Sequence, residues 1–378
     1  MQARRRDSGD GMRLRLVILV VAVLSGCTPR GAIVMLPEGV QPQETQTVFI
    51  GTTRGPDPET GEPFGKTRQT EARFARLVVA IPPEREPGQV EWPRPGRPLD
   101  ARREFAAVEE AVYPGRAAFR ADLARAFRAR RRGEREAMIF VHGFNNTFAE
   151  GAYRQAQLAE DLKISAVLVH YSWPSIAHPL GYAYDRDSAL FARDGLEALL
   201  REVVAAGAER VLIVAHSLGS ALTMEALRQM AIAGDSPLRP DRTGVVLISP
   251  DIDVDVFRAQ AARIGALPRP FLILASKRDR ILSLSARISG QRNRLGNVTD
   301  AQRLADLKVT LIDTTAFSRG VGHFDAATSP SLLAILGGIG SVDSAFRGDN
   351  AVRTGLFPGV ALTVQNATEI ILRPISGM

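Results

Sequence analysis

The sequence has few of the residues that build several common kinds of site. It holds one cysteine, Cys27, so no disulfide can form within the chain. Its five histidines are scattered without a metal-ligand spacing such as H-E-x-x-H, and we expect no metal and no other cofactor. Lys and Arg outnumber Asp and Glu by 48 to 41, but no basic tract is interleaved with aromatic residues. Nucleic-acid binding is therefore not expected.

Apolar runs of about 20 residues, the length that a bilayer-spanning helix needs, are also missing. A shorter apolar run, 16–24, follows a basic start and ends in Leu24-Ser25-Gly26-Cys27. A basic start, a short apolar run and small residues are the layout of a secretory signal. The ending resembles the bacterial lipoprotein cleavage box, in which Cys27 becomes the lipidated N-terminus. We therefore expect a signal peptide over 1–26 and a lipid-anchored protein of the cell envelope that faces the periplasm.

Proline, glycine and polar residues divide the rest of the chain into segments. Their mixture over 27–46 predicts a flexible tether. The same residues, with charge, predict loops over 54–70 and 82–100. The signals weaken after residue 330, where we expect a C-terminal extension, 331–378. Its expected elements are a closing helix and a hairpin, Leu332–Ile339 and Val360–Leu372.

From residue 138 onward, short apolar runs alternate with helical stretches. The runs lack polar alternation, which is typical of strands buried on both faces of a parallel sheet. Repeated βα units predict an α/β fold, a mostly parallel doubly wound sheet with flanking helices, over residues 47–330. Its functional residues are expected at the C-terminal ends of the strands. The predicted strands are 47–50, 77–81, 138–141, 166–169, 211–214, 245–248, 271–274 and 309–312, and the predicted helices are 117–131, 185–204 and 218–233.

The stretch 211–219, VLIVAHSLG, carries the most specific signal. Four apolar residues run directly into Ala215-His216-Ser217-Leu218-Gly219, and a helical period follows. The nucleophile elbow of α/β hydrolases reads G-x-S-x-G, with small residues where strand and helix converge. Alanine at the first position keeps that steric requirement. The pattern predicts that Ser217 is a nucleophile on a tight strand-to-helix turn.

Histidine order supports this interpretation. The chain contains His142, His170, His178, His216 and His323. In this fold the triad follows the chain order Ser, acid, His, and only His323 comes after Ser217. His323 lies in a glycine-rich loop after the last predicted strand, where it can reach back over the sheet. His216 is excluded as the base because an adjacent side chain points away from the serine hydroxyl.

The triad acid should follow a late strand. Asp279 lies five residues beyond the apolar run 271–274, and Asp251, Asp253 and Asp255 follow the run 245–248. The common arrangement favours Asp279, and Asp251 is the alternative acid. The acid would hold the imidazole of the base in one tautomer and stabilise its charged form.

Two further features belong to the expected site. The backbone N–H groups of Leu218 and Phe144 are the predicted oxyanion donors, with Asn145 as the fallback for the second. His142, beside them, is expected to be a buried histidine bonded to nearby backbone. Trp173, Tyr182 and Tyr184 follow a strand and are candidates for the substrate pocket, although core packing explains such aromatics equally well.

Together these residues resemble a bacterial family of uncharacterised, esterase/lipase-like α/β hydrolases. The resemblance spans roughly residues 47–330 and implies the α/β-hydrolase fold and its Ser-acid-His triad, without naming a substrate. Its match at Pro250-Asp251-Ile252-Asp253 also keeps Asp251 as a candidate functional residue. The matching stretches are Thr52-Thr53-Arg54, Val79-Ala80-Ile81-Pro82-Pro83, Phe140-Val141-His142-Gly143-Phe144-Asn145, Ser172-Trp173-Pro174-Ser175, Ala215-His216-Ser217-Leu218-Gly219, Pro250-Asp251-Ile252-Asp253 and Gly322-His323.

The expected function is therefore hydrolysis of a small-molecule or lipid ester through an acyl-enzyme. Two alternatives stay open. One is an amidase or peptidase that uses the same triad, because both reactions pass through a tetrahedral intermediate. The other is a hydrolase-fold protein without activity that binds an envelope partner.

Overall fold

The computed structural model describes residues 31–93, 96–290, 294–318, 323, 328–329, 333, 359–364 and 366–372. The predicted signal peptide and Cys27 lie outside these residues, as does the predicted closing helix apart from Leu333. Within the described part, no helix is long and apolar enough to cross a membrane.

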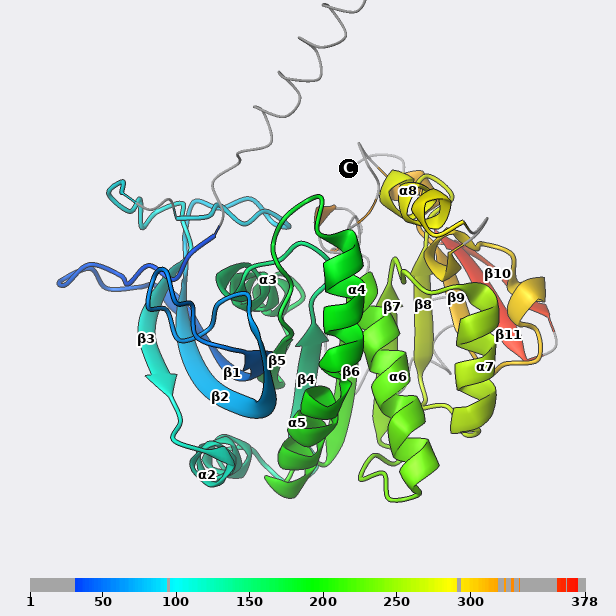
Figure 1. The fold of residues 1–378 in the computed structure, drawn as a ribbon, viewed down its shortest axis with the longest axis horizontal. Coiled ribbons are helices and arrows are strands. Elements are labelled where there is room, and N and C mark those ends of the chain that lie inside the picture. Colours follow the sequence, from blue (N-terminus) through cyan, green and yellow to red (C-terminus); the bar gives the residue numbers. More distant parts are fainter. Residues whose placement is uncertain are drawn as a thin grey trace, which may run out of the picture.

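A sheet of eleven described strands, most of them parallel, forms the centre of the molecule (Figure 1). Its order is β10-β11-β9-β8-β7-β6-β4-β5-β1-β2-β3, and only β1–β2, β2–β3 and β10–β11 pair antiparallel. Consecutive parallel strands are joined by helices, which is the doubly wound arrangement that the alternating runs predict. The strands are β1 (Glu44–Arg54), β2 (Arg68–Ile81), β3 (Ala106–Val112), β4 (Glu136–Val141), β5 (Val167–Ser172), β6 (Arg210–His216), β7 (Thr243–Ile248), β8 (Phe271–Ala275), β9 (Thr310–Asp313), β10 (Gly359–Val364) and β11 (Ala367–Leu372).

Alternation along each buried strand supplies two cores, one on each face of the sheet. In β6, Val211 and Ile213 pack into one cluster, whereas Leu212 and Val214 pack into the other. The first cluster includes side chains of α2 and α5–α7, and the second includes side chains of α3. Figure 1 shows α4–α7 in front of the sheet and α3 behind it. The helices are α2 (Arg116–Arg128), α3 (Phe148–Asp161), α4 (Tyr182–Phe191), α5 (Arg193–Ala205), α6 (Leu218–Ala233), α7 (Val254–Ile264) and α8 (Arg280–Ile288).

All eight predicted strands are confirmed, and the structure adds elements that were not predicted. The predicted helix 185–204 is two helices, α4 and α5, which meet at Ala192. The loop predicted over 54–70 ends early because β2 begins at Arg68. Helix α3 was not predicted, although its start carries a capping box: the Thr147 hydroxyl accepts from the Glu150 N–H, and the Glu150 carboxylate accepts from the Thr147 N–H.

The predicted flexible tether is wrong over its described part. The N–H of Leu36 donates to the Ala107 carbonyl at 2.7 Å, and the N–H of Ala107 donates to the Val34 carbonyl at 2.8 Å. Residues 44–46 already belong to β1. Backbone pairing with the edge strand β3 holds this segment on the domain despite its proline and glycine content.

The C-terminal hairpin is confirmed and is part of the main sheet. β10 and β11 pair antiparallel, from Gly359 opposite Leu372 to Val364 opposite Ala367. β11 lies parallel to β9, beyond the last strand of the predicted domain. The sheet therefore extends past residue 330, where the predicted domain ended.

Candidate active site

Ser217 occupies the turn between β6 and α6 in a backbone conformation that few residues adopt. Its φ is 53° and its ψ is −121°, a strained region that costs on the order of 1–3 kcal/mol. A Cβ at Gly219 would collide with the backbone carbonyl oxygens of Val141 and His142. A Cβ at Gly143 would lie 2.6 Å from the His216 ring nitrogen Nδ1. The small residues around the serine are therefore required by the close approach of the β4 loop to the elbow.

Three side chains from the ends of three strands form one hydrogen-bonded chain. The Ser217 Oγ lies 3.1 Å from Nε2 of His323, and Nδ1 of His323 lies 2.9 Å from Oδ2 of Asp279. Because a carboxylate only accepts, Nδ1–H donates to Asp279 and Nε2 is free to accept from the serine hydroxyl. The three residues predicted from the sequence as a triad, Ser217, Asp279 and His323, thus lie in contact.

Asp279, the carboxylate of this hydrogen-bonded series, is held by a helix as well as by the imidazole of His323. Asp279 is the N-cap of α8, and its Oδ1 accepts from the N–H of Leu282 at 2.9 Å. Asp279 is fully buried, whereas the His323 side chain is 15% exposed. The helix N-terminus favours a negative charge, so one carboxylate oxygen serves the helix while the other faces the imidazole.

The two predicted oxyanion donors are next to the serine, and among the described residues neither has an acceptor. No described residue accepts a hydrogen bond from the N–H of Phe144 or of Leu218. Leu218 is the first residue of α6, where backbone N–H groups have no partner within the helix. The N–H of the fallback residue, Asn145, already donates to Oδ2 of Asp185 at 3.1 Å. The pair Phe144 and Leu218 therefore fits this role better than the fallback.

Two buried charged residues that sequence reasoning missed hold the loop after β4. The Arg54 guanidinium donates to the Asn146 carbonyl at 2.8 Å and to the Ser175 carbonyl at 3.1 Å. Asp185 accepts from the Asn145 N–H and, at 2.5 Å, from the Ser175 hydroxyl. Burial raises the pKa of Asp185 above its usual value. For Arg54 and its partner Ser175 the signal was present, since Thr52-Thr53-Arg54 and Ser172-Trp173-Pro174-Ser175 are among the stretches that match the resembled family; no such stretch contains Asp185.

Asp251, the alternative acid, belongs to a different cluster and does not contact His323. Its Oδ2 accepts from the Tyr182 hydroxyl at 2.8 Å, and its Oδ1 accepts from the Ser285 hydroxyl at 2.8 Å. Nε of Arg294 forms a buried ion pair with Oδ1 at 3.0 Å. The Asp251 N–H donates to the Ser217 carbonyl at 3.2 Å. This carboxylate therefore binds α4 and α8 together behind the elbow.

The three pocket candidates have three different environments. Trp173 is fully buried, stacks on the His142 ring and donates its indole N–H to the His142 carbonyl at 2.7 Å. Tyr184 donates to the Lys66 carbonyl, under the guanidinium of Arg68. Trp173 therefore packs in the core, the alternative that the sequence left open, whereas a pocket role for Tyr184 stays a prediction. The Tyr182 ring packs edge-on against the ring of Phe144, the residue that carries one predicted oxyanion donor.

Three other histidines are buried, and burial lowers their pKa. The pKa of His170 is lowered to about 3, and the pKa values of His142 and His216 are held well below the usual value. His142 contacts the Gly143 and Trp173 carbonyls, as expected for a histidine bonded to backbone. Nε2 of His216 lies 3.3 Å from the His323 carbonyl, so its ring packs against the triad without joining it.

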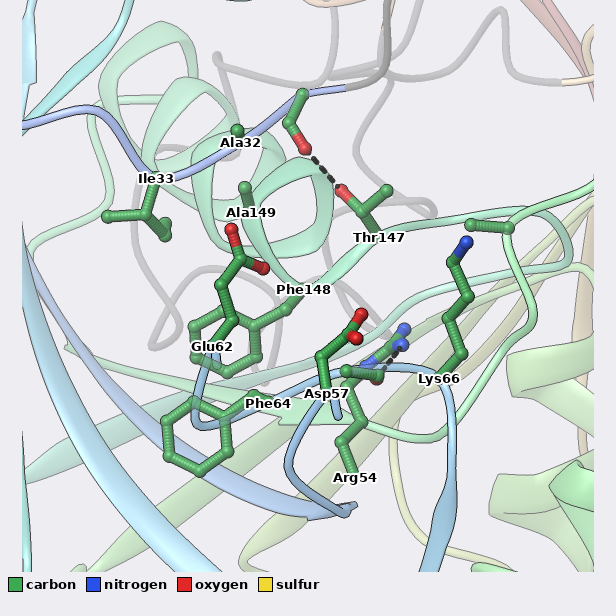
Figure 2. A pocket seen from close by; sticks show the side chains of 13 residues that line it. Ala32, Ile33, Arg54, Asp57, Glu62, Phe64, Lys66, Thr147, Phe148 and Ala149 are labelled. Carbon is green, nitrogen blue, oxygen red and sulfur yellow. Dashed lines mark hydrogen bonds between the residues drawn. The ribbon is translucent and has the colours of Figure 1, made fainter. Parts of the chain in front are cut away.

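A separate cavity of about 90 Å³ lies beside α3, and Figure 2 shows its lining. Its charged side chains come from the end of β1 and from the connection to β2; they are Arg54, Asp57, Glu62 and Lys66. They face the first turn of α3, while Phe64 and Phe148 stack in its wall with ring centroids 4.6 Å apart. Neither Ser217 nor the rest of the hydrogen-bonded chain contributes to it. In the described part of the chain no group of three His, Cys, Asp or Glu side chains could hold a metal ion.

The sequence profile of a family described as "Alpha/beta hydrolase of unknown function" (DUF900) matches residues 116–339. The chain belongs to this family. The match includes the elbow at Ser217, the aspartates Asp251 and Asp279, and His323. The α/β-hydrolase fold thus follows from the family and from the observed sheet, and the chain is a member of a hydrolase superfamily.

Solved structures of hydrolases resemble the chain only distantly. An esterase of Pyrobaculum calidifontis shares 11% identity over 94% of each chain, with a TM-score of 0.34. Carboxyl esterase 2 of Tuber melanosporum shares 12% identity over 88% of this chain and 97% of its own, with a TM-score of 0.38. A thermostable esterase of Pseudomonas putida shares 14% identity over 72% of this chain and 78% of its own, with a TM-score of 0.37. Among curated proteins, no sequence matches.

Proposed function

We propose that this hydrolase-family protein cleaves carboxylic esters through an acyl-enzyme on Ser217. The observation that carries the proposal is the continuous chain of contacts from the Ser217 Oγ through His323 to Asp279. A serine hydroxyl is a weak nucleophile until a neighbouring base takes its proton. In this chain the base is oriented by a buried carboxylate, as such a mechanism needs.

The proposed reaction proceeds in two balanced halves. The Ser217 Oγ bonds to the ester carbonyl carbon while its proton passes to Nε2 of His323. The tetrahedral intermediate collapses, the bond to the alkoxide oxygen breaks, and His323 returns the proton to that oxygen. Water then attacks the acyl-enzyme by the same route and releases the acid. The negative oxygen of each intermediate would accept from the N–H groups of Phe144 and Leu218.

The direct test replaces the nucleophile. Ser217→Ala should lower ester turnover by a factor of about 10⁴ or more and abolish labelling by a fluorophosphonate probe. A panel of chromogenic esters and amides gives the rates, and thermal unfolding checks that the variant is folded. Ser220→Ala is the matched control, because Ser220 is also buried at the start of α6 but its hydroxyl donates to the Ala215 carbonyl.

Each outcome of this test has a meaning. Turnover of amides at the same site would favour the amidase or peptidase alternative. A folded wild-type chain that neither turns over an ester or amide nor reacts with the probe would contradict catalysis and favour the binding-protein alternative. Equal turnover by Ser217→Ala and wild type would remove Ser217 from the mechanism.

We also propose that the mature chain is anchored to a membrane through a lipid on Cys27, facing the periplasm. The support is the signal layout and the Leu24-Ser25-Gly26-Cys27 box. A chain carrying several acyl groups stays on a membrane more stably than one with a single group. Cys27→Ser should therefore move the protein from the membrane fraction to the soluble fraction. Unchanged fractionation would contradict the anchor.

A further inference from the structure

Helix α8 buries one side and exposes apolar side chains on the other. Leu282, Ser285 and Ala286 are buried against the domain. Leu284 and Ile288, four residues apart and therefore on one helical face, are 54% and 64% exposed. Adjacent exposed aliphatic side chains are typical of a surface that binds another molecule or a membrane.

The exposed charges of the stretch 277–290, which contains both side chains, all have the same sign. Lys277, Arg278, Arg280 and Arg287 are exposed, and none of them makes an ion pair with a described residue. Elsewhere many arginines are paired, as Arg120 is with Glu202. The one acid in the stretch 277–290 is Asp279, which is fully buried and faces His323. The surface formed by Lys277, Arg278, Arg280, Leu284, Arg287 and Ile288, the α8 face, is thus apolar and purely basic.

The α8 face lies at the edge of the sheet that carries the triad. α8 follows β8 directly, and its N-cap is the aspartate of the triad. Figure 1 shows α8 at the top, where the loop between β5 and α4 also lies. Leu180 in that loop is 88% exposed.

The start of the described chain is fixed at this edge too. The Gly31 N–H donates to Glu150 at 3.0 Å, and the Gly31 carbonyl accepts from the Thr147 hydroxyl at 2.9 Å. Both partners belong to the first turn of α3, after the C-terminal end of β4. Cys27 precedes Gly31 by four residues, a span of at most about 14 Å. A lipid on Cys27 would therefore hold this edge close to the bilayer, a support that rests on the proposed anchor.

We propose that the α8 face docks on an anionic phospholipid bilayer and presents the triad edge to it. A short helix with aliphatic side chains and arginines on its exposed side lies in the interface of such membranes. The arginines and the lysine complement the anionic headgroups, and Leu284 and Ile288 enter the boundary of the acyl chains. The enzyme would then meet lipid esters at the membrane surface.

The test measures vesicle binding by the full chain with the anchor removed, Cys27→Ser. Co-sedimentation with vesicles of phosphatidylethanolamine and phosphatidylglycerol should exceed that with phosphatidylcholine alone. Leu284→Ser/Ile288→Ser should weaken partition about tenfold, from the lost burial of aliphatic surface. Arg280→Gln/Arg287→Gln should weaken it by a similar factor at low salt, and less at high salt because salt screens the attraction.

Ile232→Ser is the matched control for Ile288→Ser. Ile232 is 47% exposed in the last turn of α6, away from the triad edge, and its loss should leave partition unchanged. Vesicle binding needs no turnover, so a failure of ester hydrolysis and a failure of docking are separate results. Partition that ignores anionic lipid, or that Leu284→Ser/Ile288→Ser does not change, overturns the proposal. Self-association through these two residues without vesicle binding assigns the face to a second copy and also overturns it.

Discussion

Two buried aspartates stand at the ends of neighbouring strands, and they have different partners. Asp251 follows β7 and is held by Tyr182, Ser285 and the Arg294 guanidinium. Asp279 follows β8 and shares its oxygens between a helix N-terminus and His323. The first carboxylate is saturated by groups that only fix structure, whereas the second has one oxygen left for an imidazole.

The comparison shows that burial and position at a strand end do not make a catalytic acid. Ser285 lies on α8, the same helix that Asp279 caps, so the Asp251 cluster fixes the helix that carries the other aspartate. Asp251 also donates its N–H to the Ser217 carbonyl. We therefore infer a division of labour: Asp279 orients the base, and Asp251 holds the frame around it.

Of changes to the two aspartates, Asp279→Asn should have the larger effect. An amide at this position would no longer favour the Nδ1–H tautomer of His323, so kcat should fall by about 10⁴. Asparagine is also a good N-cap, and it keeps an oxygen for the Leu282 N–H, so the melting temperature should change little. Steady-state ester kinetics measures kcat, and calorimetry measures the melting temperature. A larger rate loss in Asp251→Asn than in Asp279→Asn would reverse the comparison.

The second effect is on stability and comes from Asp251→Asn. Breaking the pair would leave the Arg294 charge buried without its partner, which costs about 3–5 kcal/mol. Chemical denaturation should show this loss, while kcat falls much less than in Asp279→Asn. Asp255→Asn is the control, because Asp255 is exposed in the first turn of α7 and its change should stay within about 0.5 kcal/mol. If Asp251→Asn were as stable as wild type, the contacts of Asp251 with Tyr182, Ser285 and Arg294 would not stabilise the fold around the triad.

The smallest expected effect per site concerns the three buried histidines beside the elbow and the neighbouring strands. Burial lowers the pKa of His170 to about 3 and holds the pKa of His142 and of His216 well below 6.5. Below about pH 6.5 the unfolded chain binds protons that the folded chain does not, so their contribution is present above pH 6.5 and is lost as the pH falls toward 3. Each histidine adds a slope of up to about 1.4 kcal/mol per pH unit.

Urea unfolding at several pH values between 7.5 and 5 measures this slope. His170→Gln should reduce the slope of unfolding free energy against pH by the contribution of about one proton, whatever its effect on stability at neutral pH. His178→Gln is the comparison variant, because it removes an exposed imidazole instead of a buried one. A stability that does not vary with pH over this range would mean that the buried histidines accept protons in the folded state.

The parts that could be predicted from the sequence depend on short-range rules. The strands buried on both faces were found because their apolar runs lack alternation, and the elbow was found because a serine stands between small residues after such a run. β3 was missed, since its AAVEEAV pattern puts three charged or exposed residues in the middle of a strand. The packed segment 31–43 was missed because its partners, the edge of β3 and the first turn of α3, are about 70 to 120 residues away along the chain.

The sequence by itself determined the order of the strands along the chain, the strained turn at Ser217 and the short list of acids and bases that could serve it. Only the tertiary structure decided which aspartate meets His323, that Trp173 packs in the core, and that Arg54 and Asp185 hold the loop after β4. The physical reason is that propensities and spacing act over a few residues. The partner of a buried charge is instead set by contacts between strand ends that are dozens of residues apart.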